Sequence, residues 1–179
     1  MSFMLYLDKA DFVLGQQPPQ KNGGSEKKLI LKNKITNSFS LIMFSGNDCD
    51  YCKELKPVFQ KLVGTIPNCQ IGTVNVSLQP GLAELSQQTT TPIRYVPLIL
   101  FYINGTPFKE FGGNYTEANL RQFVKEVSAK ANEIMGLQGS FNADDGEISK
   151  HSVGKAVSKR VCYLNFDNAY NGTPPPTSD

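Results

Sequence analysis

The stretch Cys49-Asp50-Tyr51-Cys52 decides most of what this sequence predicts, because it places two cysteines two residues apart. Residues 39–44 form an apolar run of strand length, and Ser45-Gly46-Asn47-Asp48 after them is typical of a turn. Residues 50–62 then have the spacing of apolar side chains that favours a helix. The cysteine pair therefore lies where a strand turns into a helix, and it can close a small redox-active disulfide there.

The position of Cys49 predicts an unusual thiol. A helix N-terminus favours an anion, so a cysteine there can fall in pKa from about 8.5 toward roughly 3.5–7.5. Asp48 and Asp50 flank Cys49, and a unit charge about 6 Å away opposes the thiolate by roughly 0.7–3 kcal/mol at an effective dielectric of about 20–80. Both aspartates are also typical helix N-caps. We predict that these carboxylates tune the pKa of Cys49 and cancel much of the advantage of the helix terminus.

The rest of the middle of the chain alternates strand and helix patterns. Asn104-Gly105 follows a continuous apolar run and is a strong hairpin signal, so the next strand should run antiparallel to the one before it. Gly112-Gly113 ends that strand. The predicted strands are 70–76, 96–103 and 107–111, and the predicted helices after the first are 81–88 and 116–135.

Composition divides the 179 residues into three parts around one core. We expect residues 1–35 to be an irregular extension with a linker at Pro18-Pro19 and Gly23-Gly24, and residues 36–134 to form the folded domain. Residues 135–179 are rich in Gly, Ser, Asn and Asp and should form an irregular tail. Its aromatic side chains predict a segment that docks on the domain or on a partner; they are Tyr163, Phe166 and Tyr170.

Several classes of function are not favoured by the composition. A net charge of +2 without an aromatic basic patch predicts no nucleic-acid binding, and no apolar run approaches the ~20 residues of a membrane span. The first residues lack the pattern of a secretory signal, so we expect a soluble, cytoplasmic protein. Cys69 and Cys162 read as small buried hydrophobic residues. Without a second close cysteine pair, neither a metal site nor another cofactor is predicted.

At this point the chain resembles the thioredoxin family, over roughly residues 36–130. Lys53 directly follows Cys52, and Pro57 lies where thioredoxins carry the proline that kinks their active-site helix. The resemblance implies an α/β thioredoxin-like fold, with a central mixed β-sheet flanked by helices and with N- and C-terminal extensions. It also implies that Cys49 attacks a disulfide of a protein substrate and that Cys52 resolves the mixed disulfide.

The resemblance extends to the groove that holds the substrate. Val96-Pro97 occupies the place of the family's cis-proline loop, whose proline packs against the disulfide and whose preceding backbone pairs with an extended substrate. Gly113 falls where a family glycine borders this groove. The predicted substrate-binding residues are therefore Val96, Pro97 and Gly113.

The chain also departs from the family. Met43 stands where thioredoxins carry a buried acid, and Asp48 replaces the tryptophan before the pair. The leading hypothesis is a thiol-disulfide oxidoreductase acting on protein disulfides. The alternative is a structural or interaction subunit of a larger assembly that binds through its tail. Residues 161–170 are similar to the tails of thioredoxin-like proteins of large DNA viruses, so that assembly could be a virion.

Glutaredoxins offer a third, more distant resemblance. Their Cys-Pro-Tyr-Cys is similar to Cys49-Asp50-Tyr51-Cys52. However, the distance from Pro97 to Gly112-Gly113 suits thioredoxins and is too long for the turn that binds glutathione. The thioredoxin family therefore remains the better match.

Overall fold

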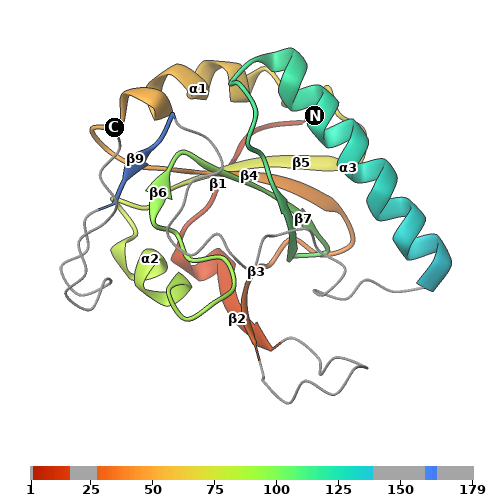
Figure 1. Cartoon of the computed structure of the whole chain (residues 1–179), viewed down its shortest axis with the longest axis horizontal. Coiled ribbons are helices and arrows are strands. Elements are labelled where there is room, and N and C mark those ends of the chain that lie inside the picture. Colours follow the sequence, from red (N-terminus) through yellow and green to blue (C-terminus); the bar gives the residue numbers. More distant parts are fainter. Residues whose placement is uncertain (1, 17–27, 139–159, 165–179) are drawn as a thin grey trace.

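A five-stranded mixed sheet forms the centre of the computed structural model, which describes residues 2–16, 28–138 and 160–164 (Figure 1). Two neighbouring pairs of strands are parallel and the other two pairs are antiparallel. This architecture confirms the predicted α/β class with a central mixed sheet. In spatial order the strands are β1 (Leu5–Tyr6), β5 (Cys69–Asn75), β4 (Phe39–Ser45), β7 (Leu98–Ile103) and β8 (Thr106–Glu110).

Helices cover both faces of this sheet. α1 (Asp50–Gln60) and α3 (Glu117–Gln138) lie on one face, and α2 (Pro80–Ser86) lies on the other (Figure 1). The central strand β4 supplies side chains to both sides, because successive residues of a strand point in opposite directions. Leu41 and Met43 pack in the cluster that contains the buried residues of α1 and α3, while neighbouring residues of β4 pack in the other cluster. A strand that is buried on both faces reads as one continuous apolar run.

The predicted hairpin joins β7 to β8. Asn104 and Gly105 have positive φ angles of 50° and 82°, as a tight hairpin turn requires, and the two strands are antiparallel. A side chain at Gly105 would place its Cβ 2.3 Å from the Asn33 carbonyl oxygen. Glycine therefore satisfies both the backbone conformation and the close approach of the chain.

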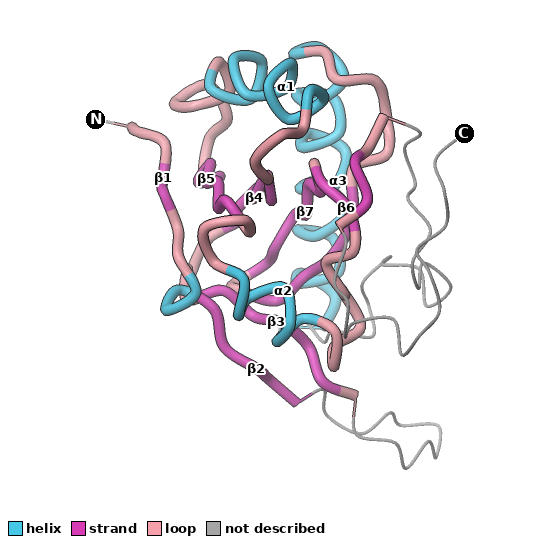
Figure 2. The backbone as a smooth tube through the Cα atoms, turned by 90° about the vertical axis from the view of Figure 1, so that its left-hand side faces the viewer, coloured by secondary structure: helices cyan, strands magenta, loops and turns pink. Residues whose placement is uncertain are grey.

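The N-terminal part of the chain is more regular than its composition predicts. β1 pairs with β5 in parallel and so extends the main sheet, and a short 3-10 turn, Lys9–Asp11, follows it. β2 (Phe12–Gln16) then pairs antiparallel with β3 (Leu29–Asn33), below the main sheet in Figure 2. The expectation of an irregular extension is therefore wrong for the described part of residues 1–35.

The expected linker at Pro18-Pro19 and Gly23-Gly24 lies outside the described residues. The limits of the folded domain, which we placed at residues 36 and 134, stay a prediction. α3 itself continues to Gln138, beyond the predicted end of that helix.

A second small sheet lies beside the start of α1. It pairs β6 (Tyr95–Val96) with β9 (Cys162–Tyr163) in antiparallel orientation, so a short segment of the C-terminal tail lies on the domain (Figure 1). Tyr163, one of the three aromatic residues expected to dock, contacts the Tyr95 ring at a centroid distance of 5.9 Å. The other two, Phe166 and Tyr170, fall outside the described part of the chain.

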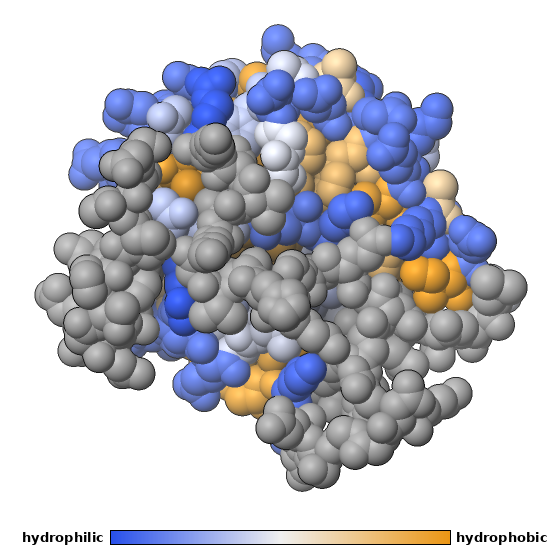
Figure 3. All heavy atoms as spheres, viewed as in Figure 1, coloured by the Kyte–Doolittle hydropathy of each residue, from blue (hydrophilic) through white to orange (hydrophobic). Residues whose placement is uncertain are grey.

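The surface seen in Figure 3 is mainly hydrophilic along the side of α1 and α3, with smaller hydrophobic areas between the polar side chains. Large apolar side chains that are well exposed are Phe3, Tyr6, Val13 and Leu78. Within the three described ranges, no helix has both the length and the hydropathy needed to cross a membrane.

The packing of β2 provides a test that the N-terminal strands belong to the core. Phe12 is buried, and its ring lies 5.6 Å from that of Phe44, centroid to centroid. We expect Phe12→Ala to lower the free energy of unfolding by about 3–5 kcal/mol, measured by urea denaturation. Val13 on the same strand is 45% exposed, so Val13→Ala is the matched control and should have little effect. Equal, small effects of the two substitutions would show that β2 does not contribute to the core.

Candidate functional site

The candidate site begins where β4 ends. The turn after Ser45 brings the chain to α1, and Cys49 is the N-cap residue of that helix. Its Sγ accepts a hydrogen bond from the backbone N–H of Cys52 at 3.3 Å. The expectation that Asp48 and Asp50 cap the helix is therefore corrected: the cysteine side chain takes the place that an aspartate usually fills, Asp48 precedes the cap with φ of 56°, and Asp50 lies in the first turn.

Both cysteines of the pair are buried thiols. Cys49 is 2% exposed and Cys52 is 5% exposed, and all four cysteines of the chain are free. The thiol of Cys49 donates to the Val96 carbonyl oxygen at an Sγ to O distance of 3.6 Å. The next residue, Pro97, is buried and follows a cis peptide bond. The structure thus brings Val96 and Pro97, two predicted substrate-binding residues, to the side of Cys49.

Cys162 is the residue that the sequence analysis missed. It lies on β9 directly opposite Val96, whose carbonyl oxygen accepts from the thiol of Cys49. The interpretation of Cys162 as a small buried hydrophobic residue holds in part, since the residue is half-buried and packs against the core, but it gave no sign that Cys162 lies beside the cysteine pair. Cys69, by contrast, begins β5, and its thiol contacts the Gln70 carbonyl oxygen at 3.8 Å.

Burial has a larger effect on the pKa of the Cys49 thiol than the N-terminus of α1 has. Burial raises the pKa of Cys49 to about 11, against the lowering effect of the Cys162 thiol. Burial likewise raises the pKa of Cys52, although hydrogen bonding to Cys49 lowers it. The exposed carboxylate of Asp50 is one of the charges that raise the pKa of Cys162. The predicted tuning of Cys49 by Asp48 and Asp50 stays a prediction.

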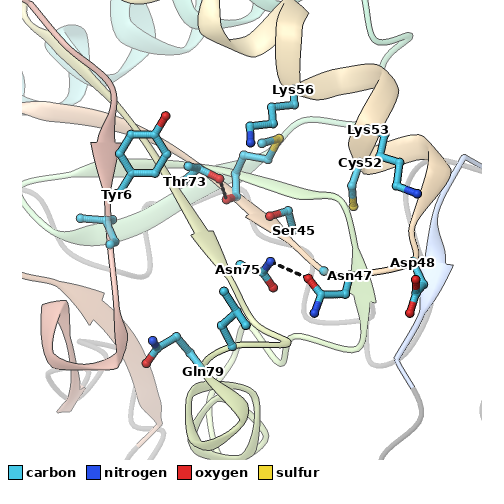
Figure 4. Close-up of a pocket in the computed structure, with 14 residues that line it drawn as sticks. Tyr6, Ser45, Asn47, Asp48, Cys52, Lys53, Lys56, Thr73, Asn75 and Gln79 are labelled. Atoms are coloured by element: carbon cyan, nitrogen blue, oxygen red, sulfur yellow. Dashed lines mark hydrogen bonds between the residues drawn. The ribbon is translucent and has the colours of Figure 1, made fainter.

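A pocket of about 660 Å³ lies on the Cys52 side of the site (Figure 4). Cys52, Lys53 and Lys56 reach it from α1, opposite Tyr6 of β1. Met43 also lines the pocket, where the family resemblance expects an acid, and its carbonyl oxygen accepts a hydrogen bond from the Thr73 hydroxyl at 3.0 Å. Cys52 thus borders open space, and no carboxylate takes the place of Met43.

The family resemblance also predicted roles for Pro57 and Gly113. Pro57 lies inside α1, as the resemblance implies. Gly113 is exposed after β8, and a Cβ there would come 3.0 Å from the ring of Phe111. Its role beside a substrate stays a prediction.

A half-buried carboxyl group lies next to the cis-proline loop. The hydroxyl of Tyr95 donates a hydrogen bond to Glu110. Burial raises the pKa of Glu110 to about 7, and the hydrogen bond from Tyr95 opposes this increase. The ring of Tyr95 also contacts Tyr163 of β9, so one side chain connects the carboxyl group with the docked tail.

We expect Cys49 to react slowly with iodoacetamide at neutral pH. Its thiolate should form with a midpoint near pH 11, because burial raises the pKa to about that value. Pulsed alkylation of the full chain, followed by fragment-ion mass spectrometry, measures the rate at Cys49 separately from Cys52. A midpoint at or below about pH 8 would show that the helix terminus outweighs burial.

The same assay tests the flanking carboxylates. Replacing Asp48 and Asp50 with asparagine should speed alkylation of Cys49 by less than about tenfold, because exposed charges act through water. The Asp8→Asn variant, which changes an exposed aspartate on another part of the fold, is the control for a general charge effect. Slower alkylation in the double variant would instead show that the aspartates mainly stabilise the helix start.

Glu110 should make folding stability depend on pH. Its pKa in the folded chain, about 7, is above the ordinary value of 4.5, so the folded state holds a proton that the unfolded state releases. Its contribution is therefore complete below about pH 4.5 and is lost as the pH rises through about 7. In Glu110→Gln this loss should be absent, while the amide oxygen can still accept from Tyr95. Parallel unfolding curves of the two proteins between about pH 4 and 8 measure the effect, and identical pH profiles would contradict it.

The sequence is similar to known proteins over much of its length. The Thioredoxin family model matches residues 23–126 of the 179. "Uncharacterized protein 196R" of Invertebrate iridescent virus 6 is 82% identical over the full length of both chains. "Uncharacterized protein 020R" of Invertebrate iridescent virus 3 is 34% identical, over 93% of this chain and 96% of its own. These viral relatives confirm the resemblance to thioredoxin-like proteins of large DNA viruses.

A solved structure of human ERp44 shares 16% sequence identity, with a TM-score of 0.49, and the match covers 70% of this chain and 29% of that chain. The thioredoxin of Malassezia sympodialis shares 22% identity, with a TM-score of 0.42, over 52% of this chain and 77% of its own. Because the family model covers more than half of the sequence, the chain belongs to the thioredoxin family.

Proposed function

We propose that the chain is a thiol-disulfide oxidoreductase that uses Cys49 and Cys52 on disulfides of protein substrates. One observation carries the proposal: Cys49 is the N-cap of α1, and its Sγ accepts the backbone N–H of Cys52. The same N–H would stabilise negative charge on Cys49 when its thiol is deprotonated. The pair therefore has the position and the chemistry for thiol-disulfide exchange.

The exchange takes place in two displacements. The Cys49 thiolate attacks one sulfur of the substrate disulfide, and the other substrate sulfur leaves as a thiolate. The Cys52 thiolate then attacks Sγ of Cys49, which releases the second substrate thiolate and closes the bond from Cys49 to Cys52. The substrate gains two electrons and two protons, and the chain is oxidised by the same amount.

The backbone beside Pro97 is the proposed position of the substrate. The Val96 carbonyl oxygen lies 3.6 Å from Sγ of Cys49, so a peptide that pairs with Val96 passes close to the attacking sulfur. Gly113 is proposed to border the same groove on the far side. Main-chain pairing of this kind recognises an extended backbone, which suits substrates of varied sequence.

Two features favour low reactivity. Burial raises the pKa of both thiols of the pair, and Met43 supplies no acid to accept the proton of Cys52. The chain is therefore proposed to act slowly at neutral pH compared with a thioredoxin that carries an exposed, acidic thiol.

A second candidate function is an interaction subunit of a larger assembly, with little reductase activity. The occupied position beside Val96 and the raised pKa values favour it, since both restrict the thiols. Viral relatives make a virion one such assembly, and the cytoplasm of an infected cell is the other proposed location. The tail beyond α3 would then supply the partner contacts.

A disulfide reduction assay separates these two functions. With dithiothreitol as the electron donor, we expect the full chain to accelerate the reduction of insulin, and Cys49→Ser to abolish the acceleration. Cys69→Ser removes a cysteine outside the pair and should leave the rate unchanged. Thiol counting in redox buffers between about −120 and −300 mV should also show one reversible disulfide between Cys49 and Cys52. No acceleration together with no exchange at this pair would exclude the oxidoreductase and leave the interaction subunit.

A further inference from the structure

The described part of the C-terminal tail occupies the strand position beside the thiol pair. In β9, Cys162 pairs with Val96 and Tyr163 pairs with Tyr95. The backbone N–H of Leu164 continues the ladder by donating to the Arg94 carbonyl oxygen at 2.8 Å. Antiparallel pairing of this kind is how an added peptide strand binds an exposed sheet edge. Here the added strand is part of the same chain.

Side-chain contacts hold this segment in place on both sides of Cys162. Val161 is 4% exposed and belongs to the core cluster of the α2 face, and Leu164 packs against that cluster. Arg160 forms an ion pair with Glu54 and lies over the ring of Tyr51, 5.5 Å from its centroid. Buried apolar contacts in the middle, with an ion pair at the rim, are the contacts of a specific docked peptide.

The docked strand presents a thiol to the attacking cysteine. Cys162 lies opposite Val96, whose carbonyl oxygen accepts from the thiol of Cys49. Cys162 packs against the cluster of buried residues that contains Cys49 and Cys52, and the thiols of Cys49 and Cys162 each affect the pKa of the other. Cys49, Cys52 and Cys162 thus lie near the N-terminus of α1, although Cys162 is far from the other two in the sequence.

We propose that residues 160–164 act as an internal substrate, in which Cys162 exchanges disulfides with Cys49 and the strand excludes other peptides from the groove. The chemistry rests on the proposed function, since it starts from the disulfide between Cys49 and Cys52. The Cys162 thiol loses its proton and its thiolate attacks Sγ of Cys49. The bond from Cys49 to Cys162 forms as the bond to Cys52 breaks, and Cys52 leaves as a thiolate that takes up a proton. One disulfide replaces another, so no further oxidant is consumed.

The exchange explains why the docked strand pairs with Val96 and also carries a cysteine at the position opposite Val96. A strand that only covered the groove would need its backbone and apolar side chains, and any small residue could lie opposite Val96. A cysteine at that position places a thiol opposite the residue whose carbonyl oxygen accepts from Cys49. The tail can then store the oxidised state in a form that a protein substrate cannot reach until β9 leaves the groove.

The test uses the full chain with Cys52→Ser and oxidised glutathione as the probe. Glutathione first forms a mixed disulfide with Cys49, and Cys162 should then displace reduced glutathione and form the disulfide from Cys49 to Cys162. Non-reducing peptide mass spectrometry should find this cross-link as the main product. The Cys52→Ser/Cys69→Ser variant should give the same product, whereas Cys52→Ser/Cys162→Ser should retain glutathione on Cys49. Persistent glutathione on Cys49 with Cys162 still reduced in the Cys52→Ser chain would overturn the proposal.

The unmodified chain separates this inference from the proposed function. If it forms the disulfide from Cys49 to Cys52 in glutathione buffer but Cys52→Ser never cross-links to Cys162, the internal substrate is excluded and the oxidoreductase stands. If the unmodified chain forms only the cross-link from Cys49 to Cys162, the proposed pair is wrong, and the exchange that displaces Cys52 is overturned with it.

A second variant tests the covering role of the strand. Val161→Asp places a carboxylate in an apolar site and should release β9, because a buried unpaired charge is costly. Alkylation of Cys49 at constant pH should then become several-fold faster, and reduction of insulin should accelerate in parallel. Circular dichroism shows whether the domain remains folded, and a folded variant with unchanged alkylation of Cys49 would contradict the covering role.

Discussion

The whole site depends on how firmly β4 is held at the centre of the sheet. β4 pairs in parallel with β5 and antiparallel with β7, and its residues from Leu41 to Phe44 are at most 1% exposed. A strand that is paired on both edges and buried on both faces cannot change its register without moving every apolar side chain to the wrong side. The chain therefore leaves the sheet at one fixed point after Ser45, and Cys49 becomes the N-cap of α1.

Two effects compete at that N-cap, and burial prevails. A helix N-terminus favours a negative charge by about 0.3–1 kcal/mol at the surface, and by up to ~2 kcal/mol when partly buried. The pKa of Cys49 nevertheless rises from 9.0 to about 11, a net preference for the thiol on the order of 3 kcal/mol. Reactivity therefore depends on what covers the sulfur. Because β9 lies against the Cys49 sulfur, the position of β9 decides how strongly the N-terminus of α1 can stabilise the Cys49 thiolate.

Local patterns predicted the fold where neighbouring residues decide the structure. The turn between β4 and α1 and the hairpin at Asn104-Gly105 each depend on a few adjacent residues, and both formed as expected. β1 and β9 were missed, because strands of two residues have no periodicity and their partners are far away in the sequence. For the same reason Cys162 read as a hydrophobic residue: its apolar neighbours predict burial, but only the pairing with Val96 reveals which thiol it meets.

The short strand β6 links the thiol of Cys49 to the docked tail, because its two residues contact different neighbours. Val96 holds the thiol of Cys49 through its carbonyl oxygen, while Tyr95 donates to Glu110 and contacts the Tyr163 ring. Departure of β9 would uncover the backbone edge of β6 and the sulfur of Cys49 in one event, because the same strand covers both. A ligand that competes with β9 must replace both the backbone pairing with β6 and the contact with the Cys49 sulfur. An extended peptide that carries its own disulfide meets that requirement, whereas a small thiol replaces only the contact with sulfur.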